Sequence, residues 1–283
     1  PYVMTDLDGT LEVDGTSWAA DVVRFDEDVL IDTAVIIADT VILNDAIVTL
    51  AADISEFIIV ANTVIGYGES LIQWELSGTS ANDENDEADP GQAESGQSGS
   101  PYTTPSYAEF YGEDGGDGTD GETGSVGIVG DDAPDVYLYM KYFTLEENTT
   151  SSVGAYQVMM PDFDLRGQDG SQGGQGQDGG DGGHGDKGAD SDPRWYECHA
   201  GVGWGGDGGD GGVGGNGGTG GQGGEGGDLN FYVVDFPQNT YVFSFDYDLS
   251  GGEGGDGGAG GDGGSGGDGG DAGDPVGFWC SAE

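Results

Sequence analysis

The sequence is poor in basic residues. Its 283 residues include five Lys and Arg against 55 Asp and Glu, which gives a formal net charge of −50. Nucleic acids and anionic membranes are bound through clustered basic side chains, so this surface repels both. The charge balance therefore predicts a soluble, self-repelling protein with no nucleic-acid partner, suited to a saline or cation-rich environment.

Long apolar runs are also missing. No stretch reaches the length of about 18 apolar residues that indicates a membrane span. The sequence starts at Pro1 without a signal peptide, as expected of a mature, processed secreted chain. We therefore expect an extracellular protein, either secreted or displayed on a cell or virion surface.

Groups suited to catalysis are scarce. Asp6-Leu7-Asp8-Gly9-Thr10 resembles the nucleophile motif of haloacid-dehalogenase-type phosphatases, but no alternating βα pattern follows it. The lysines that such an enzyme needs are limited to Lys141 and Lys187. The histidines, His184 and His199, are isolated, which argues against a zinc site. No catalytic triad or phosphate-binding loop is present, so we expect no enzymatic activity and no cofactor, apart from possible calcium.

Glycine recurs at every third position in four long tracts. They contain seven, eight, eight and eight triplets and no proline: tract 1 (112–132), tract 2 (167–190), tract 3 (205–228) and tract 4 (251–274). The absence of proline disfavours a collagen triple helix. Gly/Ser-rich chains are often flexible linkers, but a disordered linker gives no reason for four tracts of matched length.

A period of three is typical of the polyproline II conformation, which glycine-rich chains adopt as polyglycine II. This conformation has no internal hydrogen bonds, so its backbone groups need neighbouring chains or water. Glycine on two of three faces lets tracts approach closely enough to bond laterally. Because these tracts bury little apolar area, we expect packing against further copies and hence self-association into an oligomer or filament.

An antiparallel order of consecutive tracts has two consequences. It brings inserts 133–166 and 229–250 to one end, which we call the tip, and insert 191–204 together with the C-terminal tail to the other. At that second end a disulfide between Cys198 and Cys280 is predicted, in an oxidising compartment. At the tip, hairpins are predicted, and their aromatic side chains are candidates for receptor or glycan recognition: Tyr137, Tyr139, Tyr142, Phe231, Tyr232, Tyr241 and Phe243. Asn148 lies in a glycosylation sequon.

The third residue of each triplet is often acidic. In a Gly-Gly-X tract these side chains form one column about 9 Å apart, given a rise of ~3.1 Å per residue. We interpret the acids as a solvent-facing coat, with calcium between neighbouring columns as an alternative. The calcium candidates are Asp207, Asp210, Asp256, Asp262 and Asp268.

Residues 1–76 contain the proportion of apolar residues that is usual for a domain with a hydrophobic core. They are rich in Val, Ile and Thr, and Val29, Val35, Val41 and Ile47 recur every six residues. The pattern predicts short β-strands, arranged as a small β-solenoid or as a sandwich. Residues 77–111 are polar and predict a linker or a surface excursion. The predicted fold class is thus an all-β N-terminal domain (1–76) plus, in 112–283, an antiparallel bundle of four polyglycine II helices with β-hairpin inserts at 133–166, 191–204 and 229–250.

The four tracts resemble the polyglycine II bundles of T-even-type phage tail-fibre adhesins and of snow-flea antifreeze proteins. The resemblance implies rods joined by variable loops. The antifreeze likeness implies a weakly charged flat face, which the acidic columns contradict. Two functions follow as expectations. The first is a non-enzymatic secreted structural protein, a subunit of an extracellular fibre or filament. The alternative is a receptor-binding adhesin that recognises a cell-surface or glycan receptor through inserts 133–166 and 229–250.

Overall fold

A computed structural model describes residues 2–5, 12–13, 17–81, 92–98, 111–147, 156–194, 197–235, 241–243 and 245–277. The described chain forms two compact units. The first consists of Pro1–Asn82, Ile128–Ser171 and Gly221–Gly255, and the second of Asp83–Gly127, Gln172–Gly220 and Asp256–Glu283. The chain passes between the units within each glycine tract.

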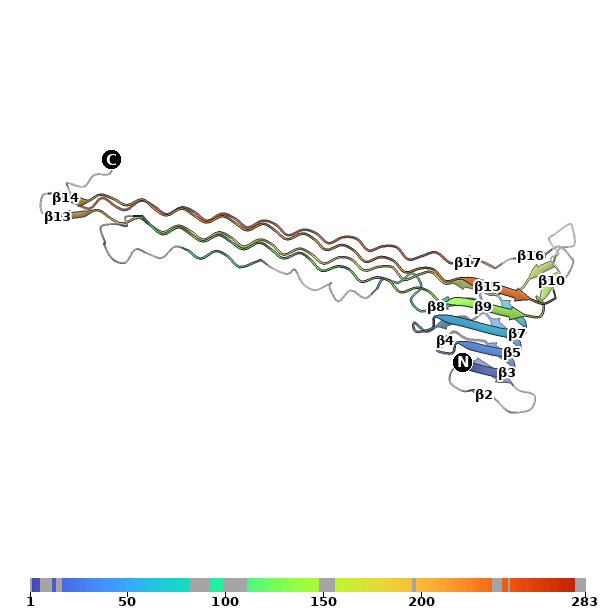
Figure 1. The fold of residues 1–283 in the computed structure, drawn as a ribbon. Coiled ribbons are helices and arrows are strands. Elements are labelled where there is room, and N and C mark those ends of the chain that lie inside the picture. The colour runs from blue at the N-terminus through green and yellow to red at the C-terminus, as the bar shows by residue number, and fades with distance from the viewer. Residues whose placement is uncertain are drawn as a thin grey trace. The chain divides into compact units, whose positions relative to one another are not determined.

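The first unit contains two parallel β-sheets, whose strands alternate along the chain (Figure 1). Sheet I has the parallel order β3(Ser17–Phe25), β5(Val35–Asn44), β7(Glu56–Tyr67), β9(Asp135–Met140) and β15(Leu229–Val233), and β1(Tyr2–Thr5) and β2(Glu12–Val13) pair antiparallel with β3. Sheet II has the parallel order β4(Val29–Ile31), β6(Ile47–Leu50), β8(Leu71–Trp74), β12(Asp162–Asp164) and β17(Tyr247–Asp248).

One apolar core joins the two sheets. Buried residues largely alternate with less buried ones along the longer strands, as the period of two in a strand predicts. The fully buried side chains include Phe25, Ile36, Phe57, Ile59 and Leu138 from sheet I and Ile31, Leu50, Ile72, Trp74 and Phe163 from sheet II. Strands of the inserts therefore complete the same core as the N-terminal strands.

The six-residue recurrence of valine does not correspond to the structural repeat. Val35 and Val41 lie on the same strand, β5, where Val41 is fully buried and Val35 is only partly buried. The aligned residues come instead from successive strands of one sheet, as in the pairing of Val35 with Ile58. The spacing of β-branched residues thus indicated strands without revealing their register.

Two small sheets complete the strand assignment. β10(Leu145–Glu147), β11(Tyr156–Val158) and β16(Tyr241–Phe243) form a three-stranded sheet in the first unit. β13(Asp192–Arg194) and β14(Glu197–Ala200) form an antiparallel pair in the second.

The glycine tracts are extended segments joined by backbone hydrogen bonds at every third residue. In the second unit, Gly115 N donates to Asp207 O (2.8 Å), which pairs tracts 1 and 3 in parallel. Gly183 N donates to Gly116 O and Gly209 N to Gly183 O (both 2.8 Å), within series that run antiparallel. In consequence consecutive tracts alternate in direction.

The same ladder is present in the first unit. Gly130 N donates to Gln222 O (2.8 Å) between tracts 1 and 3, and Gly170 N to Glu253 O (2.8 Å) between tracts 2 and 4. Every tract therefore satisfies backbone groups by bonding to other segments.

Part of the polar stretch 77–111 joins the tracts. Residues 92–98 run beside tract 2 in the second unit, where Ala93 N donates to Asp178 O (2.9 Å) and Gly96 N to Asp181 O (2.7 Å). Tract 1 also contacts this segment, because Gly116 N donates to Gln97 O (2.8 Å). This stretch supplies a fifth laterally bonded segment that its composition did not indicate.

The fold class predicted from the sequence is wrong. The described residues contain no helix, so the predicted bundle of helices is replaced by extended tracts, whose backbone bonds all go to other segments. The predicted β-hairpins in 229–250 are also absent among these residues: β15 belongs to sheet I, β17 to sheet II and β16 to the small sheet. The physical reason is that the insert strands bury their apolar faces by joining the two parallel sheets. The strands of residues 1–76 alone would leave these sheets incomplete.

Candidate functional site

The predicted recognition aromatics lie mainly on the parallel strands β9 and β15. Tyr139 aligns with Tyr232, and their rings stack with centroids 4.6 Å apart and planes 9° apart. Phe231 points inward, where its ring packs against Phe163 and Phe245 at 6.2 and 5.6 Å. The aromatic set therefore divides between an outward-facing pair and the core.

The other predicted recognition residues are spread more widely. Tyr137 is outward-facing and partly buried, and Tyr142 is exposed beyond the end of β9. Burial first, and then the Asp135 carboxylate, raise the pKa of the Tyr137 hydroxyl. Tyr241 and Phe243 lie on β16, but their side chains fall outside the described part of the structure, as does Asn148.

The outer face of sheet I carries an exposed apolar row. Ile37, Val60, Tyr139 and Tyr232 are aligned across four neighbouring strands and are 47, 40, 41 and 49% exposed. Parallel sheets are normally covered on both faces. A continuous apolar row on the uncovered face is therefore a candidate binding surface.

A polar row runs parallel to the apolar row, two residues further along each strand. It contains Asp21, Asp39 and Asn62, followed by Lys141 at the end of β9. Asn62 Nδ2 donates to Asp39 Oδ1 at 2.9 Å, which orients the amide beside the carboxylate.

A groove of about 330 Å³ lies between the two rows on β3, β5 and β7. Ala20, Ala38 and Ala61 are mutually aligned and form its floor. The sequence pointed to the tyrosines, but it did not indicate this groove. Its walls come from three strands whose adjacency depends on the parallel register.

The acidic side chains of tracts 1 and 2 have a structural role that the sequence did not reveal. Asp117 Oδ1 accepts from the backbone N–H of Asp210 in tract 3 at 2.9 Å. Asp178 Oδ1 and Asp181 Oδ1 accept from the N–H groups of Asp262 and Ser265 in tract 4, at 2.6 and 2.8 Å. Asp117 is exposed and Asp178 and Asp181 are half-buried, and all three satisfy backbone donors of the parallel neighbour.

The charges on two of these carboxyls are stabilised by the same contacts. The N–H of Ser265, and then Gln92, lower the pKa of Asp181 below its usual value. The N–H of Asp274, and then Lys187, do the same to the pKa of Asp190. Lys187 Nζ lies 2.6 Å from Asp274 Oδ2 and 2.9 Å from Asp190 Oδ1. Hydrogen bonds to these two carboxylates raise the pKa of the lysine.

Metal binding finds no support in the described ranges. They contain no group of three His, Cys, Asp or Glu side chains that could hold a metal ion. The calcium candidates are not gathered into such a group: Asp207, Asp210, Asp256, Asp262 and Asp268. His184 instead substitutes for an aspartate, since its Nδ1 accepts from Asp268 N at 3.0 Å.

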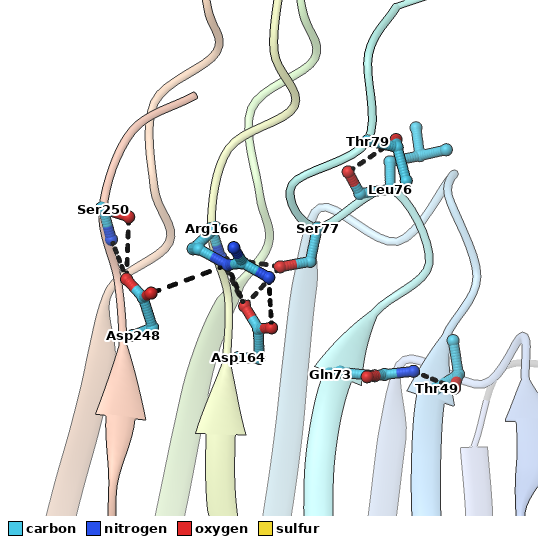
Figure 2. A network of polar contacts seen from close by, with 9 residues as sticks. All are labelled: Thr49, Gln73, Leu76, Ser77, Thr79, Asp164, Arg166, Asp248 and Ser250. Atoms are coloured by element: carbon cyan, nitrogen blue, oxygen red, sulfur yellow. Dashed lines mark hydrogen bonds and ion pairs between the residues drawn. The ribbon is translucent and has the colours of Figure 1, made fainter. Parts of the chain in front are cut away.

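Arg166 forms a polar cluster where β12 and β17 continue into tracts 2 and 4 (Figure 2). Its guanidinium contacts Asp164 Oδ2 at 2.8 Å and Asp248 Oδ2 at 3.6 Å. Ser77 Oγ donates to Asp164, and Ser250 Oγ donates to Asp248 at 2.8 Å. Burial alone raises the pKa of Asp164, but the hydrogen bonds from Arg166 and Ser77 outweigh it and lower that pKa overall. The cluster links the residues that immediately precede both tracts to the ends of the sheet II strands β12 and β17.

The predicted disulfide involves one described cysteine. Cys198 lies on β14, and no free cysteine occurs among the residues that the structure describes. Cys280 is outside them, so the pairing stays a prediction. His199 adjoins Cys198 on the same strand, and its side chain is not described.

No protein-family model, curated protein or solved structure matches this chain. The described residues also include no helix that is long and apolar enough to cross a membrane.

Proposed function

We propose that this chain is a non-enzymatic structural protein, a subunit of an extracellular fibre or filament that self-associates through its glycine tracts. The observation that carries the proposal is the glycine-lined face of tract 4. Each triplet is numbered from its leading glycine, as in Gly208-Gly209-Asp210.

Glycine at the first position of tract 4 is not required by contacts within the described chain. A Cβ at Gly257, Gly260 or Gly263 would meet its nearest atom only at 3.5 or 3.6 Å, which is ordinary van der Waals contact. In contrast, a Cβ at Gly212 of tract 3 would lie within 2.5 Å of Thr119 C and overlap the adjoining carbonyl oxygen.

Tract 1 shows which residues occur at exposed positions where packing does not require glycine. Its second positions are exposed, and most of them carry side chains, among them Glu113, Thr119, Glu122, Ser125 and Ile128. Tract 4 keeps glycine at its exposed first positions up to Gly269. A tract that packs against another copy would require this difference.

The backbone of tract 4 also presents the groups that a parallel neighbour needs. Tract 2 binds tract 4 through a first-position donor, Gly179 N to Asp262 O (2.8 Å), and a third-position acceptor, Asp178 Oδ1 from Asp262 N (2.6 Å). Tract 4 carries the same set in the adjacent residues Asp262 and Gly263. The N–H of Gly263 donates to no described residue.

The complementary groups lie on tract 1. The third-position carbonyls of Asp117 and Asp120 accept no backbone hydrogen bond from the described segments. Tract 4 of one copy can therefore bind tract 1 of the next in the manner in which tract 2 binds tract 4. Such a head-to-tail contact joins different surfaces of the two copies, so it can repeat from copy to copy and build a fibre.

Sedimentation velocity and negative-stain microscopy test this proposal. The purified chain is expected to form polymers, and the variant Gly257→Ala/Gly260→Ala/Gly263→Ala is expected to stay monomeric with an unchanged fold. Val213→Ala, an exposed third-position residue of tract 3, which takes no part in the proposed contact, is the matched control and should polymerise normally. A wild-type chain that stays monomeric at every concentration, or a triple variant that polymerises equally well, would overturn the proposal.

A further inference from the structure

We propose that the groove on the outer face of sheet I binds a neutral saccharide. The site lies within the first unit and does not involve the tract surfaces, so this inference is independent of fibre assembly.

In the three strands that form the groove, the alternation of buried and less buried residues is interrupted at aligned positions. In β5, Ala38 and Val41 are buried, while Asp39 and Thr40 between them are not. Strict alternation would bury one of that pair. β3 shows the same shift between Trp18 and Val23. Because neighbouring strands shift together, the register is kept and a groove crosses them.

The first wall of the groove is apolar, and an aromatic residue continues its row beyond the groove. Ile37 and Val60 line it, and Tyr139 follows on the next strand. Tyr232 covers one face of the Tyr139 ring. Since Tyr232 stands on the neighbouring strand β15, the opposite face of Tyr139 is directed toward β7 and Val60. A sugar ring has an apolar C–H face that fits against such a surface, and tyrosine combines an apolar body with a polar tip.

The second wall is polar and mixes acceptors with a donor. The carboxylates of Asp21 and Asp39 accept hydrogen bonds only, whereas the amide of Asn62 both donates and accepts. Neighbouring sugar hydroxyls each donate and accept, so a carboxylate and an amide at adjacent positions can hold two of them together. The groove volume of about 330 Å³ suits one small ring or a short segment of a saccharide chain.

The charge of the site selects among possible ligands. The formal net charge of −50 and the two groove carboxylates disfavour uronic, sialic and sulfated sugars. A cationic peptide is favoured less than a neutral sugar for two reasons. One oxygen of Asp39 is already bonded to Asn62, and Lys141 stands at the end of the same polar row. Neutral hexose chains therefore fit both walls best.

Isothermal titration calorimetry on the full chain tests the assignment. The probes are β-1,4-linked glucose and mannose hexamers and an α-1,4-linked glucose hexamer, with oligogalacturonate and octalysine as the charged comparisons. At least one neutral hexamer is expected to bind, and neither charged probe is expected to compete. Tyr139→Ala and Asp39→Asn should each weaken binding by about tenfold or more. Asp39→Asn keeps an acceptor for Asn62, so the fold is retained.

The matched controls are Tyr247→Ala, an exposed tyrosine of sheet II, and Asp53→Asn, an exposed aspartate in a turn. Both should bind as the wild type does, and circular dichroism checks the fold of every variant. Running the titrations in the tract 4 triple-alanine background separates this result from polymerisation. The assignment is overturned if no neutral hexamer binds, if octalysine binds in their place, or if the groove variants keep wild-type affinity.

Discussion

Two alanine substitutions on facing tracts should change stability in opposite directions. Gly212 in tract 3 and Gly263 in tract 4 are neighbours, since a Cβ on Gly263 would lie 3.6 Å from Gly212 O. Their own surroundings differ. A methyl group on Gly212 enters the backbone of tract 1, whereas one on Gly263 makes only an ordinary van der Waals contact.

The expected cost at Gly212 follows from the bonds around it. Thr119 C lies 2.5 Å from the added Cβ, so tract 1 must move away by about 1 Å to restore a normal contact of ~3.5 Å. That movement breaks or weakens the bonds from Gly118 N to Asp210 O and from Gly121 N to Val213 O, both 2.8 Å. Two such bonds at about 1 kcal/mol each, plus overpacking of about 1–3 kcal/mol, predict a loss of roughly 3–5 kcal/mol.

Gly263→Ala should instead stabilise the chain by about 0.4–1 kcal/mol, because alanine reduces the conformational freedom of the unfolded state. The φ angle of Gly263 lies outside the left-handed region, so alanine can adopt this backbone conformation without strain. Native-state hydrogen exchange of peptides from tracts 3 and 4, measured at high dilution, reports both changes locally and needs no two-state assumption. Equal effects of the two substitutions, or unchanged exchange in Gly212→Ala, would refute the packing argument.

Two further predictions concern charged contacts. The pKa of Asp190 is lowered in the folded chain from a reference of 3.8, so its stabilising contribution is complete above that value and is lost as pH falls through the lower folded pKa. A carboxyl NMR titration should place its midpoint below 3.8, and Lys187→Met should move it upward; a wild-type midpoint at or above 3.8 would contradict the contact. Arg166→Met should destabilise the first unit by about 1–2 kcal/mol in urea unfolding, less than a buried pair because the arginine side chain is 40% exposed. It should also raise the pKa of Asp164, and an unchanged pKa would show that the cluster is not formed in solution.

The sequence was sufficient to locate the glycine tracts, for a physical reason. Lateral hydrogen bonding between extended chains leaves no room for a Cβ at contacting positions, so glycine must recur with the period of the contact. The contact of Gly209 with Gly116 and that of Gly267 with Gly183 show this requirement directly. Periodicity does not specify which faces stay open. That depends on how many neighbours each tract has.

The fold class was not predictable from the same signals. Parallel pairing joins β7 to β9 and β9 to β15, strands separated by long stretches of tract. No local pattern encodes such a pairing, and the turn residues of 229–250 suggested a hairpin instead. The groove was hidden for the same reason, because Ile37, Val60 and Tyr139 become neighbours only through the register of three strands.

Solvent exposure alone does not explain why the third position of the triplets is so often acidic. An exposed polar residue of any kind would keep a tract soluble. The N–H of Asp210 requires an acceptor that reaches across to it, and the short side chain of Asp117 supplies one at 2.9 Å. At the equivalent position beside Asp268, His184 serves through Nδ1. The pattern therefore selects short acceptors where a parallel neighbour exists.

The same acids determine how assembly should depend on salt. Head-to-tail contact between tract 4 and tract 1 brings two acidic columns together, and each copy adds a formal charge of −50. Repulsion between the two columns is increasingly screened as the Debye length falls, to about 8 Å near 0.15 M salt. Average polymer mass should therefore rise steadily with sodium chloride and fall at low ionic strength, as light scattering can measure. The contact joins different surfaces of the two copies, so it is not completed in a symmetric dimer and further copies can add. A plateau at twice the subunit mass across all salt concentrations would show a symmetric contact and refute the proposed pairing of tract 4 with tract 1.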